Sequence, residues 1–165
     1  MRRVGAAAIL GGLGFVGAGV LATYSPVALA RLGLLGAALA AATIYDLGER
    51  RIPNRLVLPA AAACSGLAIG SGIAPAAMAS GLAIVAVLTA LSLAKPESLG
   101  MGDVKLALLV AVALGSAAAP ALLIGLACAA TIGAALICAR GRAALTTALP
   151  LAPFICLGAL TAIVL

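Results

Sequence analysis

The sequence contains no histidine and no tryptophan, and charged residues make up only 8% of its 165 residues. The absence of histidine excludes Ser-His-Asp and Cys-His hydrolases and the His-Glu-x-x-His metalloproteases. The four cysteines lie inside apolar stretches and none forms a Cys-x-x-Cys pair. We therefore expect buried, unreactive thiols, no metal site and no cofactor.

The scarcity of charge also argues against a soluble protein, in which about 25% of residues are charged. Here 65% of the residues are hydrophobic and the mean hydropathy is +1.33. A helix needs about 20 residues to cross a bilayer, so the chain has room for at most seven or eight crossings. We expect an all-α integral membrane protein, a polytopic bundle of about six to seven transmembrane helices. Residues 1–165 then form a single membrane-embedded domain.

Proline and glycine divide the chain into seven apolar stretches. A cleaved signal peptide is an alternative for the first 25 residues, because two arginines precede the apolar run. We favour a retained helix, since that run is as long as a full span. The expected helices cover residues 4–23, 27–45, 56–73, 75–94, 104–119, 121–139 and 145–165.

The basic residues predict the orientation of the bundle, because lysine and arginine gather in cytoplasmic loops. With the N-terminus inside, nine of the ten basic residues are cytoplasmic, and only Arg31 lies outside. This distribution explains the net charge of +6 by topology, so we expect no nucleic-acid partner. The nine residues are Arg2, Arg3, Arg50, Arg51, Arg55, Lys95, Lys105, Arg140 and Arg142.

The four acidic residues fall in two short polar windows, residues 45–55 and 95–105. An ionisable group at a membrane boundary is costly, which makes it a candidate functional group. The expected topology brings Asp46 and Asp103 to the same cytoplasmic border. Two carboxylates that share a site cannot both ionise easily, so one keeps a proton. Such a pair can activate water and protonate a peptide carbonyl without a metal.

Structural roles compete with catalysis for each of these residues. Asp103 precedes an apolar run and could cap its helix. Asp46 ends a helix, where the dipole disfavours a carboxylate. Glu49 is most simply a solvated loop charge. Lys105 either orients Asp103 or extends to the lipid headgroups, and we favour the second.

Gly100 and Gly102 precede Asp103 directly. Glycine adopts backbone conformations closed to other residues and lets another chain approach closely. We expect an extended substrate to pair with this loop through its main chain.

Together the two windows resemble the motifs of the type IV prepilin peptidases, membrane aspartic proteases of the Gly-x-Gly-Asp class. The first motif is an aspartate followed, after a short basic stretch, by Ile-Pro-Asn, and it matches Asp46 with Ile52, Pro53 and Asn54. The second is Gly-x-Gly-Asp-x-Lys-Leu, which residues 100–106 reproduce.

Two further matches support the resemblance. Glu97, six positions before Asp103, corresponds to a glutamate of family members. Residues 149–154 are similar to a Pro-Phe-Gly-Pro-Phe segment of the last helix, with Leu151 and Ala152 in place of its first phenylalanine and its glycine.

The resemblance implies catalysis by Asp46 and Asp103, with other motif residues binding substrate or shaping the active-site loop. The substrate is a prepilin or pseudopilin whose short basic leader is removed at the cytoplasmic face of a bacterial or archaeal inner membrane. Larger members carry an insert with two Cys-x-x-Cys pairs and also N-methylate the product. This chain resembles the short Flp/Tad-pilus type, which implies proteolysis alone. The residues assigned to the loop are Pro53, Asn54, Glu97, Gly100, Gly102 and Lys105.

Two other interpretations remain. Presenilin-type proteases also pair Tyr-Asp, here Tyr45 and Asp46, with Gly-x-Gly-Asp. They are larger and cleave within spans, and the Ile-Pro-Asn motif argues against them. A small transporter or a pilus or secretion assembly scaffold would use Asp46 and Asp103 as an ion site. Transporter carboxylates usually lie near the midplane, whereas these lie at the edge.

Overall fold

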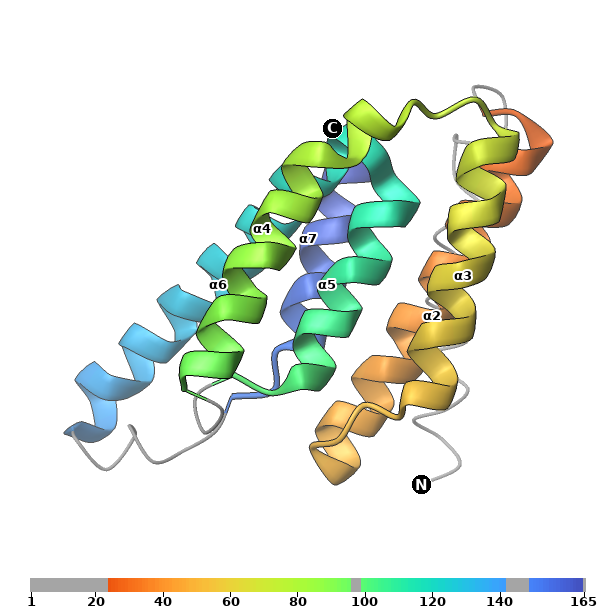
Figure 1. Cartoon of the computed structure of the whole chain (residues 1–165). Helices are drawn as coiled ribbons and strands as arrows, with labels where there is room; N and C mark the ends of the chain where they lie inside the picture. Colours follow the sequence, from red (N-terminus) through yellow and green to blue (C-terminus); the bar gives the residue numbers. More distant parts are fainter. Residues whose placement is uncertain (1–23, 96–98, 142–148, 165) are drawn as a thin grey trace.

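The computed structural model describes residues 24–95, 99–141 and 149–164, and this part of the chain is helical without strands (Figure 1). The all-α class is therefore confirmed for the described residues. The expected helix over residues 4–23 lies outside them. The elements are α2 (Pro26–Glu49), α3 (Asn54–Gly70), α4 (Pro75–Ala94), α5 (Met101–Leu114), the 3-10 turn η2 (Gly115–Ala117), α6 (Ala118–Arg140) and α7 (Ala152–Val164).

Several helix ends differ from the sequence prediction, although α4 spans the predicted residues. Helix α2 continues beyond Tyr45 to Glu49, and α5 begins at Met101. Asp46 and Asp103 therefore both lie within helices, whereas the sequence prediction placed them just outside the helix ends. Helix α5 ends early because Gly115 takes a positive φ of 58°. Most of these helices are apolar on all sides, so hydrophobic periodicity could not define their ends.

Three helical stretches are long and apolar enough to cross a membrane: Pro26–Glu49, Pro75–Ala94 and the 40-residue run Met101–Arg140. The last combines α5, η2 and α6. Helices α3 and α7 are apolar but shorter, with 17 and 13 residues. These lengths support a membrane protein, while the expected six to seven crossings stay a prediction.

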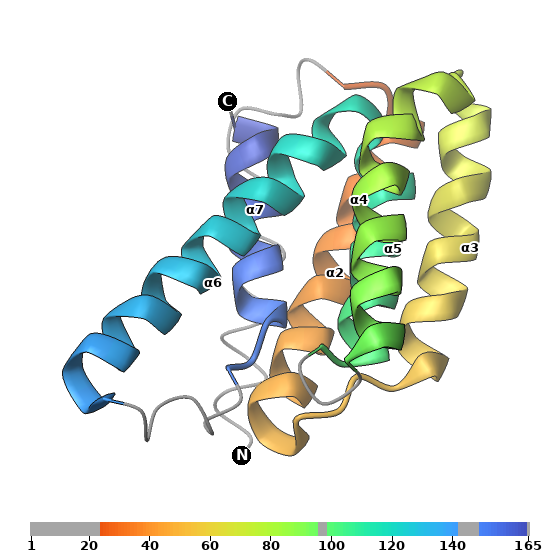
Figure 2. The same ribbon diagram turned by 60° about the vertical axis from the view of Figure 1, so that its left-hand side comes forward.

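Helix α5 is the centre of the bundle, since it contacts α2, α3, α4, α6 and α7. Leu106, Leu109 and Val110 on this helix are fully buried. Figure 2 shows α4 and α3 beside it and α7 between α2 and α6. The core begins directly after Asp103, at Val104, and so fixes the start of α5 in the bundle.

Helices α6 and α7 approach each other closely at two glycines. A Cβ atom added to Gly125 would meet the carbonyl oxygen of Phe154 at 2.7 Å, and one added to Gly158 would meet the backbone of Ala121 and Gly125. Small residues allow such backbone contact between helices in lipid. The abundance of glycine in the sequence therefore has a packing role here.

The charged residues that were predicted to share one side gather at one end of the bundle. Helices α2, α4 and α6 end there, and α3, α5 and α7 begin there (Figure 1, lower end). Arg31 lies toward the other end, is 7% exposed, and donates a 3.4 Å hydrogen bond from Nη1 to Ser71 Oγ. Which end faces the cytoplasm stays a prediction. Arg2, Arg3, Glu97 and Arg142 lie outside the described residues.

The cysteines are not all buried as expected. Cys64 is buried, whereas Cys138 is exposed. Cys138 lies on the C-terminal part of α6, which extends beyond its neighbours (Figure 2). The expectation of a buried thiol is therefore wrong for Cys138.

Candidate active site

Asp46 is one of the few buried charged residues, with 7% of its surface exposed. Its Oδ2 accepts a 3.0 Å hydrogen bond from the backbone N–H of Ala152, the first residue of α7. The N-terminus of a helix carries a partial positive charge that stabilises an anion. From the sequence, Asp46 lies near the C-terminus of its own helix, where the helix dipole disfavours a carboxylate. The positive N-terminus of α7 compensates for this unfavourable interaction.

The backbone after Asp46 turns sharply at Arg50. Arg50 has φ 52° and ψ 32°, in the left-handed region, and its N–H donates a 3.1 Å hydrogen bond to the carbonyl oxygen of Asp46. No other non-glycine residue in the described part of the chain has a positive φ. This turn ends α2 and directs residues 51–53 toward α3.

Asp103 is the third residue of α5, and the N-cap is Gly100. The alternative considered from the sequence, in which Asp103 itself caps the helix, is therefore wrong. The Asp103 N–H bonds to the Gly100 carbonyl oxygen at 3.1 Å. A Cβ atom on Gly100 would lie 3.4 Å from Asp103 Oδ2, so the carboxylate folds back over that glycine. In the first turn an acidic group also interacts favourably with the helix dipole.

Neither glycine of the Gly-x-Gly-Asp motif has a positive φ in the structure. Of the two properties of glycine considered from the sequence, the unusual backbone conformation is therefore not used here. Gly102 instead allows close packing, because a Cβ atom on it would lie 3.2 Å from the Cβ of Ile52. Ile52 belongs to the Ile-Pro-Asn stretch, so the approaching chain is the other motif. A substrate strand against this loop stays a prediction.

Lys105 makes a second contact between the motifs. Its Nζ donates a 2.9 Å hydrogen bond to Oδ1 of Asn54, the first residue of α3, directly after the N-cap Pro53. This contact gives the Lys105 ammonium a partner within the protein, while its position relative to the lipid headgroups stays a prediction. The sequence did not predict this contact, because 51 positions separate the two residues.

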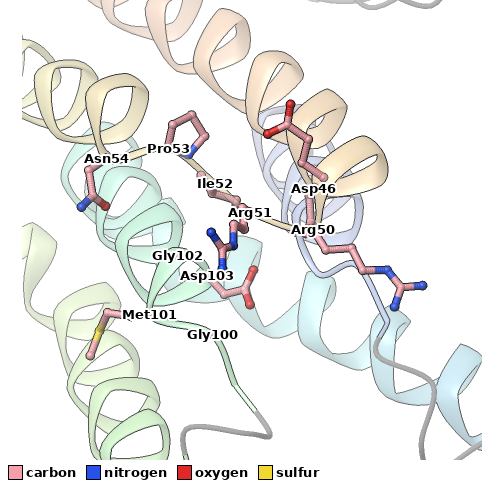
Figure 3. A pocket seen from close by; sticks show the side chains of 11 residues that line it. Asp46, Arg50, Arg51, Ile52, Pro53, Asn54, Gly100, Met101, Gly102 and Asp103 are labelled. Atoms are coloured by element: carbon pink, nitrogen blue, oxygen red, sulfur yellow. The ribbon is translucent and has the colours of Figure 1, made fainter. Parts of the chain in front are cut away.

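One cavity of about 490 Å³ lies between the two motifs (Figure 3). Asp46 and Asp103 both line it. Glu49, expected in a loop, is instead the last residue of α2, and it is exposed in the cavity wall. Glu97 lies outside the described residues. The full lining is Asp46, Glu49, Arg50, Arg51, Ile52, Pro53, Asn54, Gly100, Met101, Gly102 and Asp103.

In a comparison with known families, both motifs fall inside one matching region of the chain. Residues 33–138, more than half of the chain, match the type IV leader peptidase family. The chain belongs to this family. No curated protein and no solved structure matches it. The type IV leader peptidase family is a family of proteases, so membership supports a membrane protease of the leader-peptidase type over a presenilin-type enzyme.

The site of this leader peptidase also includes a part that the sequence indicated only faintly. Ala152 and α7 lie after the matched residues 33–138. The similarity of residues 149–154 to the Pro-Phe-Gly-Pro-Phe segment was the one signal in this region. That similarity did not indicate a contact with Asp46, because the contact is made by a backbone amide.

Proposed function

We propose that this leader peptidase is an aspartic endopeptidase in which Asp46 and Asp103 activate a water molecule. The observation that carries the proposal is the cavity at the charged end of the bundle, which both carboxylates line. Asp46 comes from α2 and Asp103 from α5. The segment that follows α2 is held against α5 by the contact of Ile52 with Gly102, and α3 is held against α5 by the hydrogen bond of Lys105 to Asn54.

The chemistry needs one proton shared by the pair. The ionised aspartate takes a proton from water, whose oxygen then forms a bond to the carbonyl carbon of the scissile peptide. The protonated aspartate donates its proton to the carbonyl oxygen. When the tetrahedral intermediate collapses, the C–N bond breaks and the departing amine takes the proton held by the first aspartate. In the same step a hydroxyl group of the intermediate returns a proton to the second aspartate, so the product acid forms and the pair regains its starting state.

The proposed substrate is a prepilin or pseudopilin with a short basic leader. Glu49 in the cavity wall has the charge sign that such a leader requires. We infer cleavage at the cytoplasmic face of a bacterial or archaeal inner membrane, with lipid as the surrounding partner. The positive residues around the cavity support this orientation. Proteolysis is the whole proposed activity, without N-methylation.

A cleavage assay tests the proposal. The chain is co-expressed with pilins of the same genome, and loss of the leader is followed by gel shift and mass spectrometry. Wild type should cleave after the leader, and Asp46→Asn and Asp103→Asn should each abolish cleavage while still inserting in the membrane. Glu49→Gln is the matched control, since it removes an acidic group from the same cavity. It should weaken substrate binding and keep turnover.

The outcomes separate the candidate functions. Cleavage that survives either asparagine substitution would exclude the aspartic mechanism. If no version cleaves any of several pilins, an ion site in a transporter or an assembly scaffold becomes the better explanation. In that case, proton flux into vesicles should depend on the same two aspartates.

A further inference from the structure

The hydrogen bond between Ala152 and Asp46 joins residues 106 positions apart. Both residues are buried, Ala152 completely. The donor is a backbone N–H, which stays in place as long as α7 stays in place. The contact reaches the site from outside the residues that match the family.

The contact restricts the Asp46 side chain. The amide holds one oxygen, Oδ2, at 3.0 Å, which limits the orientation of the carboxylate. Among the described residues, Oδ1 accepts no hydrogen bond. A hydrogen bond to a charged acceptor is about twice as strong as one between neutral groups. Asp46 also lines the cavity, so its orientation affects whatever occupies the cavity.

Helix α7 is itself held firmly. Its Gly158 packs against the backbone of Ala121 and Gly125 of α6, so no side chain separates the two helices there. Ile155 and Ala159 on α7 are buried in the core. The amide that contacts Asp46 is therefore fixed by helix packing and not by a loop.

We propose that the N-terminus of α7, through the N–H of Ala152, is a positioning element that sets the orientation of Asp46 for water activation. This inference rests on the proposed protease function. Ala152 does not contact the reacting atoms. A positioning role predicts a loss of turnover at unchanged substrate affinity, whereas a purely structural role predicts fewer folded molecules with normal kinetics.

Proline at position 152 removes the N–H while keeping the helix start. Proline is favoured at the first position of a helix because that N–H has no partner within the helix. Helices α2 and α4 of this chain already begin with Pro26 and Pro75. In Ala152→Pro we expect kcat per folded enzyme to fall roughly 10- to 100-fold, the range for a misplaced catalytic group, with KM unchanged. Ala152→Gly keeps the N–H, so its kcat should fall much less.

The matched control is Ala74→Pro, which also creates a Pro-Pro pair at a helix start. Ala74 is the N-cap of α4, at the opposite end of the bundle, and its φ of −64° suits proline. Wild-type kinetics are expected for this variant. If Ala152→Pro fails to insert or fold, the amide at position 152 can be replaced by an ester through cell-free synthesis with lactic acid. The ester lacks the donor and keeps the side chain, and we expect the same fall in kcat.

The readouts separate the two proposals. Absence of cleavage by wild type would overturn the protease function itself. Cleavage by wild type, together with an unchanged kcat in the folded proline or ester variant, would overturn the positioning role alone. A reduced kcat with unchanged KM in these variants, and normal kinetics in Ala74→Pro, would support it.

Discussion

Lys105 Nζ donates a 2.9 Å hydrogen bond to Asn54 Oδ1 and so connects the first turn of α3 to the second turn of α5. Close by, Gly102 packs against Ile52. These two contacts join the Gly-x-Gly-Asp motif to the Ile-Pro-Asn stretch, and the cavity lies between them. The motifs therefore form one unit, in which each limits the movement of the other.

Lys105→Met should disturb this unit. This hydrogen bond is exposed to solvent, so it contributes about 1 kcal/mol, and we expect kcat/KM for a prepilin to fall roughly fivefold. Lys95→Met is the control, because Lys95 is exposed at the same end of the bundle. Asn54→Ala should have an effect similar to Lys105→Met, and the double variant should be no worse than either. Fully additive losses would contradict the link.

Gly102→Ala should lower activity more than stability. The nearest atom to the added methyl group is the Cβ of Ile52 at 3.2 Å, which no change of rotamer can move. The segment that contains Ile52 must shift instead, which changes the shape of the cavity. We therefore expect kcat/KM to fall roughly tenfold. Replacement of glycine by alanine in a helix raises the free energy of unfolding by about 1 kcal/mol. This gain offsets the loss of stability that the strain causes. Gly66→Ala, where the methyl group meets open space, should keep full activity.

Gly158→Ala should destabilise the protein. The added methyl group would overlap the backbone of α6, and overpacking of this kind costs about 1–3 kcal/mol. We expect a lower midpoint in thermal unfolding in detergent. Gly133→Ala is a suitable control, since its methyl group would meet only the flexible end of Leu149 at 3.3 Å. Equal midpoints for both variants would show that α6 and α7 can separate without cost.

Arg50→Gly and Arg50→Ala remove the same charge but differ in backbone freedom. A left-handed conformation costs a residue with a Cβ about 1–2 kcal/mol, and glycine avoids this cost. With φ at 52°, position 50 should therefore make the glycine variant the more stable of the two by about 1 kcal/mol. Chemical denaturation in mixed micelles measures the difference. A more stable alanine variant would mean that the left-handed turn is not retained.

The candidate catalytic residues could be chosen from the sequence because charge is so scarce in this chain. Asp46 and Asp103 stand out against apolar surroundings, and both line the cavity. The grouping of the basic residues at one end of the bundle was also predictable, since short loops connect helices that end and begin there. Helix ends were less predictable. The last turn of α2, which contains Asp46, carries polar residues that resemble a loop.

The contacts that organise the site were not predictable from the residues alone. The amide of Ala152 has no side-chain signature, and its partner is 106 positions away. Gly102 suggested backbone freedom, but its role is to accommodate Ile52. Such contacts depend on how the helices pack. A single small apolar residue does not specify that packing, which results from all the contacts of the bundle together.

The shortness of three helices has a consequence for the surrounding lipid. Helices α3, α5 and α7 contain 17, 14 and 13 residues, so at 1.5 Å per residue they measure only about 26, 21 and 20 Å. The hydrocarbon layer of a typical bilayer is about 30 Å thick. Helix α5 is surrounded by the other helices and continues through η2 into α6, so the short length matters for lipid only at α3 and α7. Both of these helices begin at the end that contains the cavity. We expect the bilayer around them to become thinner than elsewhere, which would bring water closer to the site.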